Sequence, residues 1–195
     1  MKLVDPFKFT KFDRTPAELE AMILFSIMVA NKRADQTYAK FEALMEWPPH
    51  ARTPFDKVRA WARQGTLLGR LKQIRAGQYK RIARAFRGVL DLDLRACTVK
   101  DLETVHGIGP KTARMFLLHS RPNQRLAVLD THVLAYLRDH LVPDVPRSTP
   151  PAGKTYARLE QAFLGHCDAN GKNPAQFDLE IWEQRTKSVI NEVQP

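Results

Sequence analysis

A glycine-containing turn within residues 104–113, TVHGIGPKTA, limits the fold of this 195-residue chain more than any other stretch of its sequence. Gly107 and Gly109 lie between two apolar segments. Glycine adopts backbone conformations with positive φ and leaves space beside its backbone. We therefore predict two helices, roughly 99–105 and 111–119, joined by a tight hairpin.

The second helix of this hairpin is expected to bind an anion. The first amides of a helix lack intrahelical partners and carry partial positive charge, so they bind a phosphate oxygen without reading a base. A Gly-x-Gly pair alone also serves many helix turns purely for its geometry. Here the whole string from His106 to Ala113 is in register with the helix start, which favours a sequence-independent grip on DNA.

Three proline-containing helix starts organise the rest of the chain: Thr15-Pro16, Thr53-Pro54 and Asn173-Pro174. In each, a small polar residue precedes the proline, and an acid or amide two residues after it reaches back to the cap amide. The spacing of Thr98 and Asp101 repeats this pattern ahead of the hairpin. Strand signals are nearly absent, so we predict an all-α fold, with helices over about 16–30, 34–47, 54–63, 78–90, 99–105, 111–119, 154–165 and from 130 and 174 onward.

The chain is basic, with 31 lysines and arginines against 21 aspartates and glutamates and a formal net charge of +10. This balance favours nucleic acid as a partner, although a basic surface also serves solubility. The basic face of residues 80–87 has the same two interpretations, a phosphate-tracking surface or a solvated one. Cys97 and Cys167 are too few for a disulfide framework or a four-thiolate cluster. Without a membrane-spanning run or a signal-peptide core, the expected location is the cytoplasm or the nucleus.

Two motifs together resemble a known family. GIGPKTA at 107–113, followed by AVLDTHV at 127–133, is similar to the signature of the helix-hairpin-helix and Gly/Pro-Asp DNA glycosylase superfamily, in its lysine-bearing branch. FSIMVANKRAD at 25–35 resembles the segment where a helix of that family ends in a residue that wedges into DNA. The resemblance covers most of 17–140 and continues more loosely through FDLEIW at 177–182. It implies a compact form without an iron-sulfur cluster or an N-terminal β domain.

The resemblance implies that Lys111 is the nucleophile and Asp130 its acidic partner. Breaking an N-glycosidic bond builds positive charge on the sugar, which a carboxylate stabilises. An amine attacks the same carbon in its neutral form, gives a Schiff base with the opened sugar, and cuts the strand by β-elimination. From spacing alone, Lys111 fits a phosphate-binding lysine equally well, and Asp130 fits a plain helix N-cap.

The resemblance also implies a set of DNA contacts. An enzyme that reaches a base inside a duplex must flip it out and fill the gap. Asn31 stands at the wedge position, where an asparagine would equally cap the end of the buried helix. The other implied contacts are Lys32, Arg33, His106, Gly107, Gly109, Thr112 and His132. A first-turn histidine such as His132 fits a solvent-facing position as well.

Two further sites follow from the resemblance alone. A base pocket is implied at Phe177, Asp178 and Trp182, whose aromatic members also fit a helix core. An alkali cation is implied at the main-chain carbonyls of Glu103, Val105 and Ile108, and no other cofactor is expected. Compact archaeal oxoguanine enzymes also read their base with a C-terminal residue, for which residues 193–195 offer no obvious equivalent.

We therefore predict two helical lobes flanking a DNA-binding cleft, one formed by 17–120 and the other by 1–16 together with 121–195. The predicted function is that of a monomeric DNA glycosylase with AP lyase activity on double-stranded DNA, with oxidised guanine as the favoured base and no membrane partner. Two alternatives stay open: an enzyme of glycosylase-like fold that modifies bases, as in viral thymine hypermodification, and a non-catalytic DNA-binding module.

Overall fold

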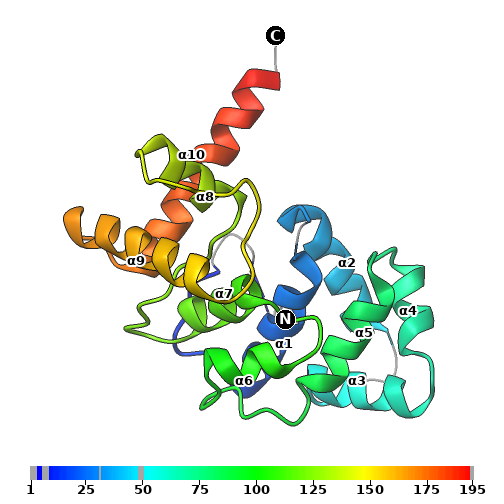
Figure 1. Cartoon of the computed structure of the whole chain (residues 1–195). Helices are drawn as coiled ribbons and strands as arrows, with labels where there is room; N and C mark the ends of the chain where they lie inside the picture. Colours follow the sequence, from blue (N-terminus) through cyan, green and yellow to red (C-terminus); the bar gives the residue numbers. More distant parts are fainter. Residues whose placement is uncertain (1–3, 6–8, 31, 48–50, 194–195) are drawn as a thin grey trace. The chain divides into compact units, whose positions relative to one another are not determined.

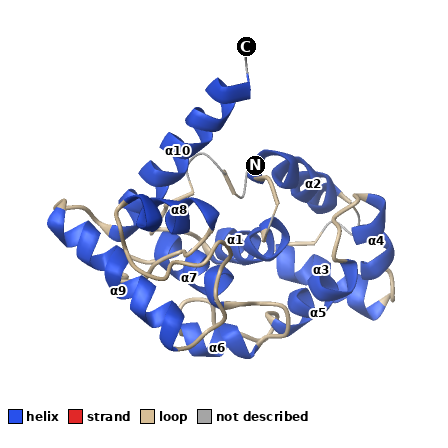
Figure 2. Cartoon of the chain, turned by 45° about the horizontal axis from the view of Figure 1, so that its top comes forward, coloured by secondary structure: helices blue, strands red, loops and turns tan. Residues whose placement is uncertain are grey.

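The computed structural model describes residues 4–5, 9–30, 32–47 and 51–193, with side-chain surroundings up to Arg185. Over these residues the chain consists of helices joined by loops, without a strand, which confirms the predicted all-α class (Figure 2). In the same residues, every helix is too short or too polar to cross a lipid bilayer.

The chain divides into two compact units, Met1–Ile108 and Gly109–Pro195. The predicted division into two lobes with a boundary at residue 120 stays a prediction.

The first unit is built around a buried helix (Figure 1). Its helices are α1 (Pro16–Val29), α2 (Ala34–Glu46), α3 (Pro54–Arg63), α4 (Leu67–Gln73), α5 (Tyr79–Gly88) and α6 (Val99–Thr104). Every residue of α1 from Ala21 to Val29 is buried, as its continuous apolar sequence predicts. This helix packs against α2, α3 and α5, and α4 packs against α3 and α5. Helix α4 had no clear sequence signal, because its seven residues include Gly69.

The predicted helix starts are confirmed by their caps. Thr15 and Glu18 form a reciprocal capping box, and Thr98 with Asp101 forms a second one at α6. The hydroxyl of Thr53 accepts a hydrogen bond from the third amide of α3. In the second unit, the N–H of Ala175 donates to the side chain of Asn173, 2.9 Å away. Polar residues therefore set where these helices begin, as the sequence predicts.

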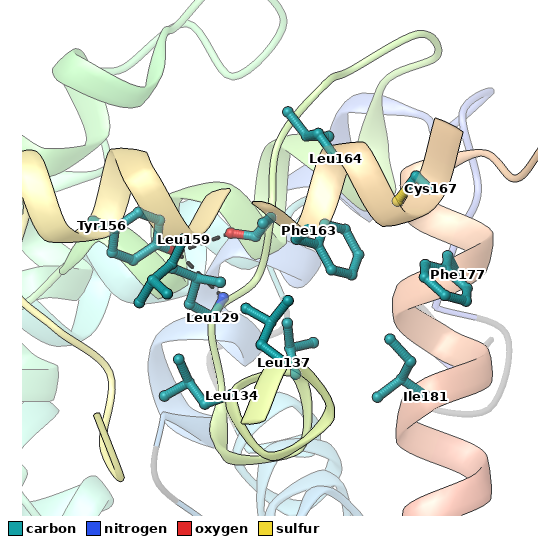
Figure 3. Packing of buried hydrophobic residues seen from close by; sticks show 12 residues of the cluster. Leu129, Leu134, Leu137, Tyr156, Leu159, Phe163, Leu164, Cys167, Phe177 and Ile181 are labelled. Atoms are coloured by element: carbon teal, nitrogen blue, oxygen red, sulfur yellow. Dashed lines mark hydrogen bonds between the residues drawn. The ribbon is translucent and has the colours of Figure 1, made fainter. Parts of the chain in front are cut away.

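The second unit encloses its own core (Figure 3). Its helices are α7 (Pro110–Ser120), α8 (Thr131–Asp139), α9 (Lys154–Ala169) and α10 (Pro174–Val193). Helix α10 packs against α7, α8 and α9, and α8 also packs against α9. Leu134, Leu137, Leu159 and Phe163 are fully buried between these helices. The four helices are thereby held in one arrangement, which fixes the polar side chains they carry.

The buried carboxylate of Glu160, on α9, connects separate parts of the second unit by hydrogen bonds. It accepts hydrogen bonds from Arg114 Nε at 2.8 Å and from the N–H of Ala127 at 2.9 Å. The guanidinium of Arg114 lies over the Tyr156 ring, 4.2 Å from its centroid. The Tyr156 hydroxyl donates to the carbonyl of Ala127 and accepts from the N–H of Leu129 (Figure 3). Helix α7, helix α9 and the segment 127–129 are therefore tied to one another.

Removing Glu160 should destabilise the protein strongly. In Glu160→Ala the Arg114 guanidinium loses its carboxylate partner and the buried Ala127 amide loses its acceptor, which should lower the free energy of unfolding by about 3–5 kcal/mol. Urea denaturation followed by circular dichroism measures this change. Glu183→Ala on exposed α10 surface is the matched control and should stay within about 0.5 kcal/mol of the parent. Equal stability of the two variants would contradict the role of Glu160.

Candidate active site

The hairpin requires glycine at position 107 for two reasons. Gly107 has φ +92°, in the region that side-chain-bearing residues rarely adopt. A Cβ atom built on it would lie 2.8 Å from Arg81 Cγ and 3.2 Å from the Arg81 carbonyl oxygen. Gly109 differs, because its φ of −97° and ψ of 177° are ordinary extended values. Of the two glycines, Gly107 uses the positive φ that glycine allows, and Gly109 does not.

Arg81 of α5 holds the hairpin turn within the first unit. Its Nη1 donates to the carbonyl of Gly107 at 2.7 Å, and its Nη2 donates to the carbonyl of Ile27 at 2.9 Å. Its Nε donates to the side chain of Gln78 at 2.6 Å. Burial lowers the pKa of Arg81, but a guanidinium stays charged at physiological pH. One side chain thus ties the hairpin to the last turn of α1.

The predicted wedge region follows the end of α1. Asn31 lies outside the described residues. The Lys32 ammonium donates to the carbonyl of Met28 at 2.9 Å, and burial, with the charges of Arg81 and Lys40, lowers the pKa of Lys32 to about 8. Arg33 is exposed and pairs with Asp35 at 2.9 Å. The implied DNA contacts of Lys32 and Arg33 stay predictions.

The start of α7 presents unpaired amides. Gly109 is its N-cap without a side chain, and Pro110 occupies the first helical position. Pro110 has no N–H, and the amides of Lys111 and Thr112 precede the first intrahelical bond, from the N–H of Ala113 to the carbonyl of Gly109. Thr112 is 4% exposed, and its implied DNA contact stays a prediction. His106, on the first unit, is exposed, and its contact stays a prediction.

Lys111 begins a row of side chains along α7. Lys111, Met115 and His119 follow at intervals of four residues and therefore share one side of the helix. The Lys111 ammonium lies 3.9 Å from the Met115 sulfur and is half-buried. A lysine held against an apolar neighbour is suited to act as an amine nucleophile once it loses its proton.

Asp130 is the N-cap of α8. Its Oδ1 accepts hydrogen bonds from the N–H groups of His132 and Val133, each at 2.9 Å. The structure therefore confirms the capping geometry that the sequence left open. Two amide donors hold the carboxylate in place, so the same geometry is compatible with the implied catalytic role.

Asp178 of α10 lies in the interior beside α7. Its Oδ2 is 3.1 Å from His119 Nε2, and these residues are 9% and 1% exposed. Burial raises the pKa of Asp178, contact with His119 lowers it, the charge of Asp130 raises it, and that of Lys111 lowers it. Both implied catalytic residues are therefore within electrostatic range of Asp178 in the same unit.

Trp182 follows Asp178 by one helical turn and so lies on the same side of α10. Its ring contacts His132 edge-to-face, with ring centroids 6.5 Å apart. Helices α7, α8 and α10 thus gather five predicted site residues in the second unit: Lys111, Asp130, His132, Asp178 and Trp182.

Phe177 does not lie with these five predicted site residues. It stacks on Phe163 with ring centroids 5.8 Å apart and meets Tyr136 edge-to-face at 5.4 Å. It belongs to the hydrophobic core of the second unit (Figure 3). The helical rotation of about 100° between neighbouring residues explains why Phe177 and Asp178 face different surroundings. The core interpretation therefore fits Phe177 better than the implied base pocket.

The sequence did not predict the structural importance of two residues, Arg81 and His119. Arg81 was grouped with the basic face of residues 80–87, where Lys80, Arg84 and Arg87 are indeed exposed. His119 had one weak signal, its spacing of eight residues from Lys111. Neither partner, Gly107 for Arg81 nor Asp178 for His119, is close in sequence.

The implied cation site involves main-chain atoms at the end of α6. Glu103 lies in the last turn of this helix, and Val105 follows as its C-cap. The carbonyl of Val105 accepts the N–H of Ile108 at 3.0 Å. Among the residues the structure covers, no group of three His, Cys, Asp or Glu side chains could hold a metal ion. The carbonyl site stays a prediction, because it uses none of these side chains.

Comparison with protein families identifies a helix-hairpin-helix motif at residues 92–119. Curated relatives share 35% identity over 77 residues, among them the "8-oxoguanine DNA glycosylase/AP lyase" of Thermotoga petrophila and that of Thermotoga maritima. The match covers 39% of this chain and only 36% of each relative's length.

Solved structures match over more of the chain. The 8-oxoguanine DNA glycosylase of Thermotoga maritima matches with a TM-score of 0.64 and 22% identity, covering 87% of this chain and 80% of that one. The 8-oxoguanine glycosylase/lyase of Methanocaldococcus jannaschii, in complex with a 15-mer DNA containing 8-oxoguanine, matches with a TM-score of 0.67 and 18% identity, covering 95% and 87%.

The chain therefore carries a helix-hairpin-helix motif at residues 92–119, and its fold is similar to that of solved DNA glycosylases. Within that class, its fold is that of the 8-oxoguanine DNA glycosylases of Thermotoga and Methanocaldococcus. The motif and the fold predicted from GIGPKTA and AVLDTHV are thereby confirmed.

The two hairpin glycines should respond differently to alanine. Gly107→Ala forces a positive φ and a close contact with Arg81, which should cost about 1–3 kcal/mol of unfolding free energy. Gly109→Ala is the control, because its backbone is extended and no described atom lies within 4 Å of the added Cβ. Urea denaturation compares the two variants. A loss at Gly109 as large as that at Gly107 would contradict this account.

Proposed function

We propose that the chain is a DNA glycosylase with AP lyase activity that removes a damaged base from double-stranded DNA, with oxidised guanine as the favoured base. The observation that carries the proposal is that α7, α8 and α10, which carry Lys111, Asp130 and Asp178, belong to one unit in which α10 packs against α7 and α8. The names of the similar proteins, and the DNA complex of one of them, support the choice of base and partner.

The hairpin supplies the grip on the DNA backbone. The amides of Lys111 and Thr112 at the start of α7 are suited to a phosphate oxygen, and the bare Gly109 cap leaves the approach open. A monovalent cation at the carbonyls of Glu103, Val105 and Ile108 would add positive charge. The net charge of +10 favours the same partner. We propose a monomer that works in the cytoplasm or nucleus without a membrane partner.

The proposed chemistry uses the Lys111 amine and the Asp130 carboxylate. The neutral Lys111 Nζ attacks the anomeric carbon C1′, and the C1′–N bond breaks with its electron pair leaving on the base. Asp130 stabilises the positive charge that develops on the sugar. The resulting Schiff base makes the C2′ proton acidic, and its removal breaks the C3′–O bond to the phosphate. Strand cleavage is therefore built into the attachment of the sugar to Lys111.

The base itself must leave the helical stack. Trp182 offers an aromatic face for stacking, and Asp178 offers a polar group one turn away on α10. His132, in contact with Trp182, lies beside them. A purine with altered hydrogen-bonding edges suits a pocket that combines one ring and one carboxylate.

Lys111→Gln should abolish covalent trapping. The protein is incubated with duplexes that contain 8-oxoguanine or other damaged bases, in the presence of borohydride, which reduces a Schiff base to a stable adduct. The parent should form the adduct and Lys111→Gln should not. Lys154→Gln is the matched control, because Lys154 also starts a glycine-capped helix and should trap normally. An adduct that survives Lys111→Gln would exclude Lys111 as the nucleophile.

Asp130→Asn and product analysis separate excision from its alternatives. The variant should lower the excision rate roughly 10²- to 10³-fold while DNA affinity is kept. Mass analysis of the parent's products should find free base and a cleaved abasic sugar. Retained, enlarged bases would indicate a base-modifying enzyme instead. DNA binding without turnover on any lesion would indicate a non-catalytic binding module.

Binding should weaken steeply with salt. Each neutralised phosphate releases counterions, so affinity should fall roughly tenfold or more between about 50 and about 200 mM salt. Fluorescence anisotropy with a labelled duplex measures this, and a neutral osmolyte at matched osmolality is the control. A flat response would exclude the proposed phosphate contacts.

A further inference from the structure

The excess positive charge of the chain lies in one segment, residues 57–90. This segment contains ten lysines and arginines and neither an aspartate nor a glutamate, whereas the rest of the chain contains 21 residues of each sign. The formal net charge of +10 therefore comes from this segment, which forms most of α3 and all of α4 and α5. Charge that serves only solubility needs no such segregation, because interspersed charges of both signs serve it as well.

The ten cations of this segment fall into two groups. Four are buried or half-buried, and each is held by a backbone carbonyl or by indole rings: Lys57, Arg59, Arg70 and Arg81. These four serve the fold of the first unit. The other six are exposed: Arg63, Lys72, Arg75, Lys80, Arg84 and Arg87.

Three of the exposed cations form a row along α5. Lys80, Arg84 and Arg87 are spaced by four and three residues, so they share one side of the helix. Together with Gly88 they are the exposed positions of α5. The helix contains no carboxylate, and the nearest one in sequence, Asp91, follows its end. Like charges at this spacing repel one another, so the row lowers helix stability unless an anion binds it.

The packing of α5 places this row beside the hairpin turn. A Cβ atom built on Gly107 would lie 2.8 Å from Arg81 Cγ and 3.5 Å from Ala85 Cβ, and one built on Gly88 would lie 2.7 Å from Val105 Cγ1. One face of α5, at positions 81, 85 and 88, therefore lies against residues 105–107. Each member of the row precedes a position of that face by one residue, which is a rotation of about 100° around the helix. The row thus follows the edge of this contact.

We propose that the row of Lys80, Arg84 and Arg87 binds the phosphate backbone of the DNA, as a contact separate from the start of α7. The inference rests on the proposed function, because it takes duplex DNA as the partner. The row is about 10 Å long at a rise of about 1.5 Å per residue. That length corresponds to about three nucleotide steps of about 3.4 Å along one strand. Contacts to phosphates carry no sequence information, so the row binds damaged and undamaged DNA alike.

An acidic protein surface fits the row less well than DNA. The centre of a protein–protein interface is rich in aromatic side chains and poor in charged ones. The exposed positions of α5 carry three cations and a glycine, without an aromatic or aliphatic side chain. A regularly repeating polyanion therefore matches this face better than a folded partner does.

The test measures how binding to a labelled, undamaged duplex depends on salt, by fluorescence anisotropy. The row variant, Lys80→Gln with Arg84→Gln and Arg87→Gln, should bind roughly tenfold or more weakly than the parent at about 100 mM salt. Its plot of log affinity against log salt should be shallower by about two to three, because each phosphate contact contributes about 0.9 to that slope. Arg84→Lys with Arg87→Lys keeps the charge and should keep the slope.

The matched control removes the same charge elsewhere. Arg52→Gln with Arg147→Gln and Lys154→Gln changes three exposed cations outside residues 57–90 and should leave the slope within about 0.5 of the parent. Equal slopes and affinities in the row variant and this control would overturn the proposal. Urea denaturation followed by circular dichroism should find the row variant at least as stable as the parent, because repulsion along α5 is relieved. If the row variant does not fold, Arg84→Gln alone decides, with an expected change in slope of about one.

Undamaged DNA separates this proposal from the proposed function, because binding to it requires no excision. A parent whose binding depends on the row but which excises no base from any lesion would support the row and count against the glycosylase. A parent that binds no duplex would overturn both. Polyglutamate, an acidic polypeptide without phosphates, tests the other kind of partner. A row variant that loses polyglutamate binding and keeps its affinity for the duplex would overturn the proposal in favour of an acidic protein.

Discussion

The candidate site depends on one buried carboxylate that takes no part in its chemistry. Glu160 accepts hydrogen bonds from Arg114 on α7 and from the amide of Ala127, three residues before Asp130. Lys111 lies on the same short helix as Arg114, so this contact relates the amine to the aspartate through rigid elements. A reaction at one sugar carbon requires both groups within a fraction of an ångström of their working positions. A charged hydrogen bond at low exposure provides that restraint better than apolar contacts, which tolerate sliding.

In the hairpin, too, the groups that hold the structure in place differ from the groups that are suited to bind a ligand. Gly107 contributes through its conformation, and Arg81 fixes it by a hydrogen bond to its carbonyl. Gly109 contributes by lacking a side chain at a helix start whose amides are unpaired. A single Gly-x-Gly string therefore contains two glycines with different physical purposes. One is required by the fold and the other by the ligand that the fold is proposed to bind.

Patterns of neighbouring residues in the sequence predicted the helices well, but they predicted only part of the candidate site. Caps at Thr15, Thr53 and Thr98 and the proline starts depend on neighbours within a few residues, so the sequence contains them in full. Pairs such as His119 with Asp178, 59 residues apart, depend on how helices pack, and no local pattern encodes that packing. Phe177 illustrates the limit, because a motif places a residue on a helix without saying which side of the helix faces the core.

The two aspartates of the candidate site show how different the surroundings of identical groups can be within one unit. Asp130 lies at the N-terminus of α8, where its Oδ1 accepts hydrogen bonds from two backbone amides. Asp178 lies in the interior, where burial disfavours the charge and only His119 offsets it by direct contact. Helix α8 places one aspartate at its N-terminus and helix α10 places the other in the interior, so the difference between the two groups arises from where each aspartate sits on its helix.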